Sequence, residues 1–241
     1  MRVFAISDPH LSFSQPKPMD VFGEQWACHA ERIKEAWQAS VHEEDIVLIP
    51  GDISWAMKTK DARLDLDYLG ACPGRKIIMR GNHDYWWHSI TQVRSMLPDC
   101  MYAIQNDSLR FGHLVVCGTR GWICPGSSAF SEEDDRKIYE REVMRLNLSI
   151  QSIKRQADDY VIAMLHYPPF NEKQEKSGFV DVLEQAGVRQ VIYGHLHGKS
   201  CSCAFEGKRE GVLYRLVSCD HLQFKPILLA ETTRNATMET C

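Results

Sequence analysis

The amino-acid sequence predicts an α/β fold built in layers. Short runs that are apolar nearly throughout, such as DIVLI at Asp45–Ile49 and YVIAML at Tyr160–Leu165, alternate along the chain with helical stretches. Strands of this composition are usually buried on both faces, and their alternation with helices is typical of layered α/β folds. With 241 residues, 44% of them hydrophobic and 25% charged, the chain is long enough to bury a sizeable core.

The first half of the chain predicts alternating strands and helices. Arg2–Ser7 is a β-branched and aromatic run of the kind found in strands. From Trp26 to Val41, large apolar residues recur at helical spacing and mark an amphipathic helix. The same two patterns predict further strands at Asp45–Ile49 and Lys76–Met79, and further helices at Asp61–Leu69 and Ser89–Met96.

The second half continues this alternation and then changes character. Strands are predicted at Leu114–Gly118, Tyr160–Leu165 and Val188–Tyr193, with a helix at Phe179–Ala186 that Gly187 ends as a C′ glycine. After these, Ser200–Phe205, Val212–Ser218 and Gln223–Ala230 predict antiparallel strands, as a second sheet or an extension of the first. We expect one domain over residues 1–231 and a frayed tail over 232–241.

Ser131–Arg145 has two interpretations. Ser131 and Asp134 have the spacing of a capping box before the charged run EEDDRK, which predicts a solvated helix. The segment also follows the strand that carries Thr119 to Trp122, so it is a candidate for a lid.

Composition narrows the class of protein. The net charge is −4, so the chain lacks the strongly basic footprint of a protein that binds long duplex nucleic acid. No apolar stretch approaches the length of a membrane span, and residues 1–7 are too short for the core of a signal peptide. Nine irregularly spaced cysteines favour free thiols in a reducing cytoplasm. Cys201 and Cys203 are interpreted as apolar residues on one face of a strand, or alternatively as a thiolate metal clip.

Five motifs place polar side chains at or just beyond the ends of apolar runs. They are Asp8-Pro9-His10, Gly51-Asp52, Gly81-Asn82-His83-Asp84, His166 and Gly194-His195-Leu196-His197. In open α/β sheets the carboxyl ends of the strands form the ligand-binding edge. The candidate metal ligands are Asp8, His10, Asp52, Asn82, His166, His195 and His197.

These ligand types predict a centre for two divalent cations. Imidazole and carboxylate ligands suit Mn, Fe, Zn or Co, and we favour Mn. Asp52 is the candidate bridge, while His195 and His197, two residues apart, would point the same way on a regular strand. Two cations outweigh the negative charge of two carboxylates and a bridging hydroxide, so the centre favours a phosphate ester. His83 is the candidate general acid, and Asp84 would either orient His83 or cap the next helix.

Together these motifs resemble the calcineurin-like metallophosphoesterase superfamily over residues 6–198. The resemblance implies a four-layer α/β/β/α sandwich with mixed sheets. It also implies that Asp8, His10 and His197 bind one metal, that Asn82, His166 and His195 bind the other, that Asp52 bridges them, and that His83 is the catalytic acid. The sequence after Asp52 is unlike that of the Ser/Thr protein phosphatases. It is similar instead to a small group of predicted phosphohydrolases, from which no particular substrate follows. The resemblance to the superfamily implies a phosphate monoester or diester as substrate.

The residues that would choose the substrate are less certain from sequence. Candidates are Trp86 and Tyr167 for stacking on a ring, and Arg80 and Arg120 for a second phosphate. Core packing is the more usual role of such aromatic residues, and ion pairs within the protein explain the arginines at least as well. A nuclease of the same superfamily is the alternative enzyme. A non-catalytic binding module is the alternative outside catalysis, and it would be expected to have lost ligands that this chain retains. The sequence predicts no oligomeric state.

Overall fold

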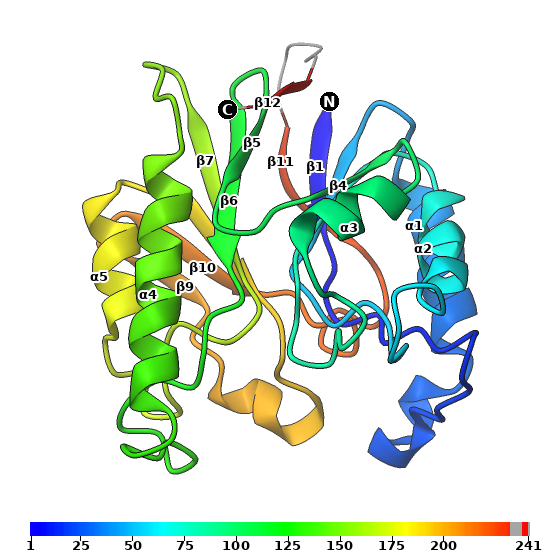
Figure 1. Ribbon diagram of the computed structural model, residues 1–241, viewed down its shortest axis with the longest axis horizontal. Coiled ribbons are helices and arrows are strands. Elements are labelled where there is room, and N and C mark those ends of the chain that lie inside the picture. The colour runs from blue at the N-terminus through cyan, green and yellow to red at the C-terminus, as the bar shows by residue number, and fades with distance from the viewer. Residues whose placement is uncertain (232–237, 241) are drawn as a thin grey trace.

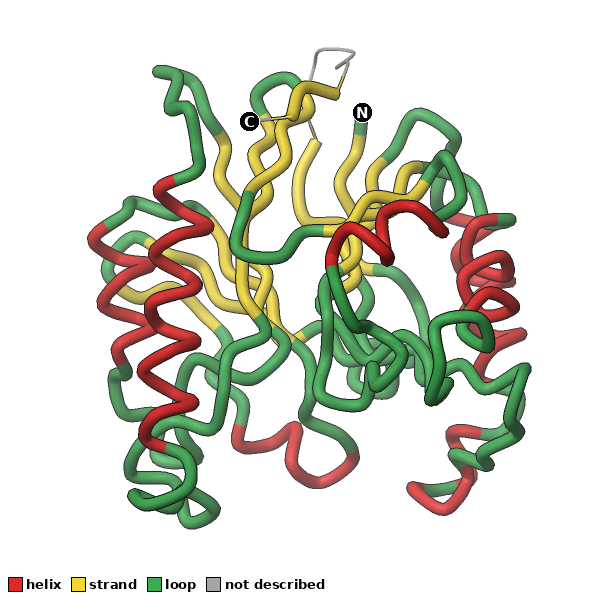
Figure 2. Tube along the Cα trace, in the orientation of Figure 1, coloured by secondary structure: helices red, strands yellow, loops and turns green. Residues whose placement is uncertain are grey.

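Two β-sheets face each other in the middle of the molecule, and helices cover the outer face of each (Figure 1). This computed structural model describes residues 1–231 and 238–240. In Figure 2 the helices form two outer layers on either side of the strands. The four-layer α/β/β/α arrangement and its mixed sheets are therefore confirmed.

The first sheet is mainly parallel. Its strand order is β11-β1-β2-β3-β4, in which only β11 is antiparallel to its neighbour. The strands are β1 (Arg2–Ala5), β2 (Ile46–Ile49), β3 (Arg75–Ile78), β4 (Met101–Ala103) and β11 (Ile227–Glu231). The helices on this side are α1 (His29–Ser40), α2 (Arg63–Gly70) and α3 (Ile90–Met96).

The second sheet follows the order β12-β5-β6-β7-β8-β10-β9. Its parallel centre is β6 (Leu114–Thr119), β7 (Tyr160–Leu165), β8 (Gln190–Tyr193) and β10 (Val212–Leu216). Antiparallel strands lie at its margins: β5 (Ser108–Phe111), β9 (Gly207–Arg209) and β12 (Met238–Thr240). The helices α4 (Arg136–Gln151) and α5 (Gly178–Gln185) cover its outer face.

The apolar strands are explained by burial on both faces. In β2, Ile46 and Leu48 belong to the core between the two sheets, whereas Val47 and Ile49 belong to the core beneath the helices. Successive side chains of a strand point to opposite faces, so a strand in this position needs an apolar residue at every place. All four of these side chains are buried.

Two stretches differ from the sequence-based expectation. Ser200–Phe205 is not a strand, because a 3₁₀ helix at Gly198–Cys203 occupies most of it. The Ser202 hydroxyl donates a hydrogen bond of 2.8 Å to the Lys199 carbonyl, a local contact that favours turns over strands. Val212–Leu216 is a strand, as expected. It pairs antiparallel with β9 but parallel with β8, whereas only antiparallel pairing was expected.

The remaining differences are short strands. β4 and β5 were not expected, since they have three and four residues and are too short to show a periodicity. Of the expected tail, Met238–Thr240 pairs its backbone with β5, while residues 232–237 and 241 lie outside the described part of the chain.

The segment 131–145 begins one of the outer helices. Ser131 caps the turn as predicted, because the Asp134 amide donates to its hydroxyl over 3.2 Å, and α4 follows from Arg136. The side chains of Tyr139 and Leu146, on one face of α4, are buried in the core beneath the helix. The helix is therefore amphipathic rather than solvated on all sides. Within the described residues, none of the helices is long and apolar enough to cross a membrane.

Two leucines of α4 test this packing. Leu146 is fully buried and Leu148 is 49% exposed. Leu146→Ala should lower the free energy of unfolding by about 2–5 kcal/mol, because it removes a core side chain and leaves a cavity. Leu148→Ala should change it by less than about 1 kcal/mol. Urea unfolding measures both, and equal effects would mean that α4 does not pack on the sheet as described.

Candidate metal centre

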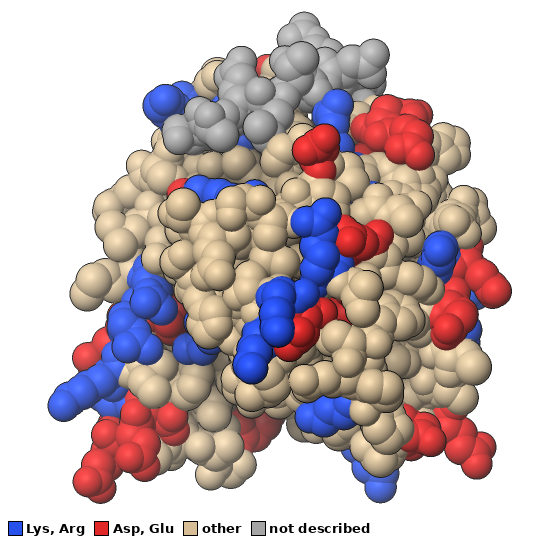
Figure 3. Space-filling view, turned by 45° about the vertical axis from the view of Figure 1, so that its right-hand side comes forward, with Lys and Arg blue, Asp and Glu red and all other residues tan. Residues whose placement is uncertain are grey.

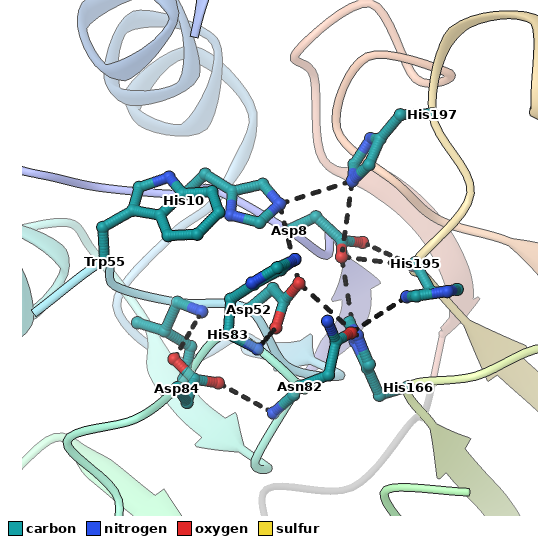
Figure 4. Close-up of polar contacts among 12 residues, drawn as sticks. Asp8, His10, Asp52, Trp55, Asn82, His83, Asp84, His166, His195 and His197 are labelled. Carbon is teal, nitrogen blue, oxygen red and sulfur yellow. Dashed lines mark hydrogen bonds and ion pairs between the residues drawn. The ribbon is translucent and has the colours of Figure 1, made fainter. Parts of the chain in front are cut away.

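The seven predicted ligands converge on one edge of the two sheets (Figure 4). Asp8, Asp52 and Asn82 lie on loops that follow β1, β2 and β3 of the first sheet. The other sheet contributes His166 after β7, and His195 and His197 after β8. Because the parallel strands of both sheets end at this edge, their loops face one another across it.

Several of these residues have a strained backbone. Asp8, His10, Asp52 and His195 have φ angles of 58°, 44°, 51° and 72°, in the left-handed region that side chains with a Cβ rarely adopt. Such strain costs on the order of 1 kcal/mol or more per residue, and it clusters at functional sites. His195 and His197 therefore lie on an irregular loop, so the expectation of a regular strand at this motif is wrong.

One group of ligand atoms comes from Asp8, His10 and His197. His10 Nε2 lies 3.4 Å from His197 Nε2, which in turn lies 3.7 Å from Asp8 Oδ1. The other ring nitrogen of His197, Nδ1, lies 2.9 Å from Asp220 Oδ1. A carboxylate behind the ring in this way fixes the tautomer that leaves Nε2 free to bind a metal.

A second group comes from Asn82, His166 and His195. Asn82 Oδ1 lies 2.6 Å from His166 Nε2 and 2.9 Å from His195 Nδ1. His166 Nδ1 lies 3.1 Å from the carbonyl oxygen of Pro50 and donates its proton there. Nε2 of His166 therefore carries a lone pair that points at the amide group of Asn82.

Asp52 lies between the two groups. Its Oδ2 is 3.6 Å from His10 Nε2 and 3.5 Å from His166 Nε2. Asp8 also approaches both groups, with Oδ1 3.7 Å from His166 Nδ1, but that nitrogen already donates to Pro50. Asp52 Oδ2 thus approaches an imidazole Nε2 atom of each group.

The donor set fits divalent cations. Burial lowers the pKa of His166 to about 3 and the pKa of His10 well below its usual value, so both rings are neutral. Burial raises the pKa of Asp8 to about 7 and that of Asp52 to about 6. Neutral imidazole lone pairs and poorly solvated carboxylates that face one another need a positive charge between them. This set can hold metal.

His83 is close to both groups without belonging to either. Its backbone N–H donates to Asp52 Oδ1 over 2.8 Å, and its ring lies 4.4 Å from that of Trp55 and 5.7 Å from that of His10. Nδ1 of His83 is buried and has no hydrogen-bond partner in the described structure. Burial lowers the pKa of His83, whereas the nearby Asp52 raises it.

Asp84 has a role that the sequence did not reveal. Its Oδ1 accepts the amide protons of Ile53 and Ser54 at 2.9 and 3.1 Å, and its Oδ2 accepts that of Gly81 at 2.7 Å. It neither orients His83 by a direct hydrogen bond nor caps α3, whose cap is Ser89. Asp84 instead joins the loop of Asp52 to the loop of Asn82 (Figure 4).

Two further supports lie behind the ligands. Asp220, which holds His197, follows β10 and belongs to none of the predicted motifs, so only the folded chain reveals it. Gly81 permits close approach of the two loops, because a Cβ there would overlap Asp52 Oδ1. The glycine that precedes Asn82 in the motif was the sequence signal for this contact.

The four candidate substrate residues do not lie together in the structure. Trp86 is fully buried and donates its indole N–H to Asp84 Oδ1 over 2.9 Å, so it does not stack on a substrate. Tyr167 packs on His195 with ring centroids 4.1 Å apart. Arg80 and Arg120 both line a different cavity, which contains none of the predicted ligands.

The start of α4 lies close to this edge. Trp122 Nε1 donates to Asp135 Oδ1 over 2.8 Å, and the ring of Trp122 packs on Tyr167 at 5.2 Å. Residues 131–135 are thus linked to His195 of the centre through Trp122 and Tyr167. α4 itself packs along the sheet, so the part of the segment near the site is its capping turn.

Comparison with known proteins agrees with this geometry. A family model described as calcineurin-like phosphoesterase matches residues 1–199, most of the chain. The protein belongs to this family. A calcineurin-like phosphoesterase is a metal-dependent phosphoric ester hydrolase, and the matched residues include every predicted ligand.

Solved structures share the fold at low sequence identity. A protein of unknown function from Aquifex aeolicus, AQ665, is 16% identical with a TM-score of 0.50, covering 94% of this phosphoesterase and 95% of its own chain. The phosphopantetheinyl hydrolase PptH from Mycobacterium tuberculosis is 14% identical with a TM-score of 0.53, covering 90% and 88%. No curated protein matches the sequence.

The Asp84 contacts predict a loss of metal affinity on substitution. Asp84→Asn should weaken Mn binding about 10- to 100-fold, because an amide cannot accept at both positions and the two ligand loops would separate. Titration of Mn against a fluorescent chelator measures the affinity, and thermal unfolding reports whether the variant folds. Asp67→Asn, at a half-exposed carboxylate paired with Arg63, is the control and should bind Mn as the unmodified protein does. Equal affinities for the two variants would contradict the bridging role.

Proposed function

We propose that this protein is a dinuclear-metal-dependent phosphoesterase that hydrolyses small phosphate monoesters or diesters. The observation that carries the proposal is the position of Asp52 Oδ2, 3.6 Å from His10 Nε2 and 3.5 Å from His166 Nε2. One carboxylate between the neutral imidazoles of His10 and His166 suits a pair of adjacent cations better than a single one.

The ligands divide between two metal positions. Asp8, His10 and His197 would hold one cation, Asn82, His166 and His195 the other, and Asp52 would contact both. When bound, Mn, Fe, Zn or Co would supply an activated water and Lewis-acid stabilisation of the phosphoryl oxygens. The chain's own contribution is to hold these groups rigidly, through Pro50 behind His166 and Asp220 behind His197.

His83 is the proposed proton donor to the leaving oxygen. Its ring lies beside Asp52 and Trp55 at the edge of the centre, and its Nδ1 is unpartnered. Since burial lowers its pKa, the ring must acquire a proton near neutral pH before it can donate one. Asp52 favours the protonated form, and a bound phosphate dianion would favour it further.

An apolar cavity beside the centre favours a small ester over a nucleic acid. This cavity of about 460 Å³ is lined by His195, Tyr167, Leu196, Phe205 and Ile123, among others. None of its described lining residues is a lysine or arginine, and Glu172 adds a negative charge. A second phosphate of a nucleic-acid backbone would be repelled there, so the leaving group is proposed to be uncharged and partly apolar.

The molecular surface supports the same preference. On the face drawn in Figure 3, basic side chains lie in small groups beside acidic ones, and most of the surface is neutral. Long duplex nucleic acid would instead need a continuous basic surface. We further propose one domain over residues 1–231, and a reducing cytoplasm, which the free thiols of the described cysteines support.

Metal analysis with one variant tests the reaction. The purified protein should contain about two metal ions per chain and hydrolyse a chromogenic phosphodiester in Mn. His83→Ala should keep both ions but lose about 10²- to 10⁴-fold in kcat, the usual value of general acid catalysis. His42→Ala, at an exposed histidine, is the control and should retain full activity. An active protein with one ion would refute the dinuclear centre, and an inactive one would revive the binding module.

A substrate panel tests the cavity. Phosphomonoesters, cyclic nucleotides, dinucleotides and single-stranded nucleic acid should be assayed with Mn, Fe, Zn and Co. We expect the highest kcat/KM for esters with an uncharged, partly apolar leaving group. Phe205→Ala should lower kcat/KM for these about tenfold or more, because it removes an apolar wall of the cavity. Phe13→Ala, at an exposed phenylalanine, should not change it. Preference for single-stranded nucleic acid would favour the nuclease.

A further inference from the structure

A second cavity, of about 300 Å³, lies between the ends of β3 and β6 and the side of α4. Arg80 and Arg120 line it from the loops that follow these strands, and Arg141 and Arg145 line it from the helix. None of the seven candidate metal ligands borders it. The cavity is therefore separate from the candidate metal centre.

Positive charge in this cavity greatly exceeds negative charge. Glu142 carries the only carboxylate among the described lining residues, and both oxygens of that carboxylate already accept hydrogen bonds. Arg145 donates to its Oε1 over 2.6 Å, and the Thr119 hydroxyl donates to its Oε2 over 2.7 Å. Arg120 and Arg141 approach the same Oε1 at 3.7 and 4.0 Å. One carboxylate thus serves three guanidinium groups.

In the described part of the chain, Arg80 forms no ion pair with Glu142. Among the described residues, its side chain makes neither a hydrogen bond nor an ion pair, and its Nε is buried without a partner. Nε of Arg120 is buried and unpartnered as well. Arg80 and Arg120 line the same cavity. Burial lowers the pKa of Arg120, Glu142 opposes this shift, and repulsion from Arg80 adds to it. Guanidinium groups stay charged in proteins, and buried donors without an acceptor are unfavourable.

We propose that this cavity binds a phosphate-type dianion, with Arg80 and Arg120 as its principal donors and Arg145 and Arg141 completing the ring. The planar guanidinium fork matches the oxygens of phosphate, and such charge-assisted pairs are the strongest hydrogen bonds in proteins. An anion there would pair with the guanidinium groups that line the cavity and offset their excess charge. This site does not depend on the proposed hydrolysis.

The cavity is linked to the metal centre through the backbone. Arg80 precedes the Gly81-Asn82 motif, and the Arg120 carbonyl accepts the amide protons of His166 and Tyr167 at 3.0 and 2.9 Å. The dianion is either a second phosphate of the substrate or free inorganic phosphate that acts as an effector. Both use the same recognition chemistry, and the kinetics below separate them.

Calorimetric titration with inorganic phosphate tests binding. The full chain should be titrated both metal-loaded and after chelator treatment, since the chelated protein reports only sites that need no metal. The chelated protein should bind one phosphate, and Arg80→Gln combined with Arg145→Gln should weaken it about 10- to 100-fold or more. Arg80→Lys should weaken it less, because it keeps the charge and loses the fork. Arg63→Gln, at a half-exposed arginine paired with Asp67, should have no effect.

Kinetics then identify the source of the anion. If it belongs to the substrate, Arg80→Gln should lower kcat/KM for a bis-phosphate more than for a simple phosphomonoester. If it is an effector, inorganic phosphate should change kcat on the simple ester in the unmodified protein and not in the double variant. Absence of phosphate binding to the chelated protein, or equal binding by the folded double variant, would overturn the proposal. Loss of hydrolysis with retained phosphate binding would overturn only the proposed function.

Discussion

The packing of the two sheets against each other through one apolar core is the constraint on which the rest of the structure depends. Ile46 and Leu48 of one sheet meet Met164 and Ile192 of the other in this core. Carboxylates and the asparagine come from the first sheet, and most imidazoles come from the second. The centre therefore forms only when the sheets are in register, and a shift between them would separate Asp52 from His166 before any ligand was changed.

Hydrogen bonds behind the ligands then fix the positions that the two sheets set. Asp84 joins two loops of the first sheet, and Asp220 and Pro50 fix the orientation of two imidazoles from the second. None of these groups faces the space where a metal would lie. They hold the ligands in place although the backbone at several of them is strained. The stability of the buried core offsets this strain, so the polar site stays rigid.

Sequence patterns predicted the layered fold and the seven converging side chains because both follow from short-range rules. An apolar run with a polar residue at its end indicates a buried parallel strand and a ligand at the sheet edge. The patterns failed at Trp86, a candidate for stacking on a substrate whose indole is buried and donates to Asp84. They also failed at Ser200–Phe205, where local hydrogen bonding favours a 3₁₀ helix over a strand. Asp220 carries no motif, so only tertiary structure brings it to His197.

The pairing of β11 with β1 has a consequence for the order in which the molecule is made. β1 is synthesised before β2 to β10 and β11 only after them, so the edge of β1 that β11 covers has no partner strand while the strands between them are made. An open edge of a sheet is a template for pairing with another chain. That edge of β1 is therefore open to pairing with another chain until β11 is made, and truncation near residue 199 would remove both β11 and the Asp220 carboxylate behind His197.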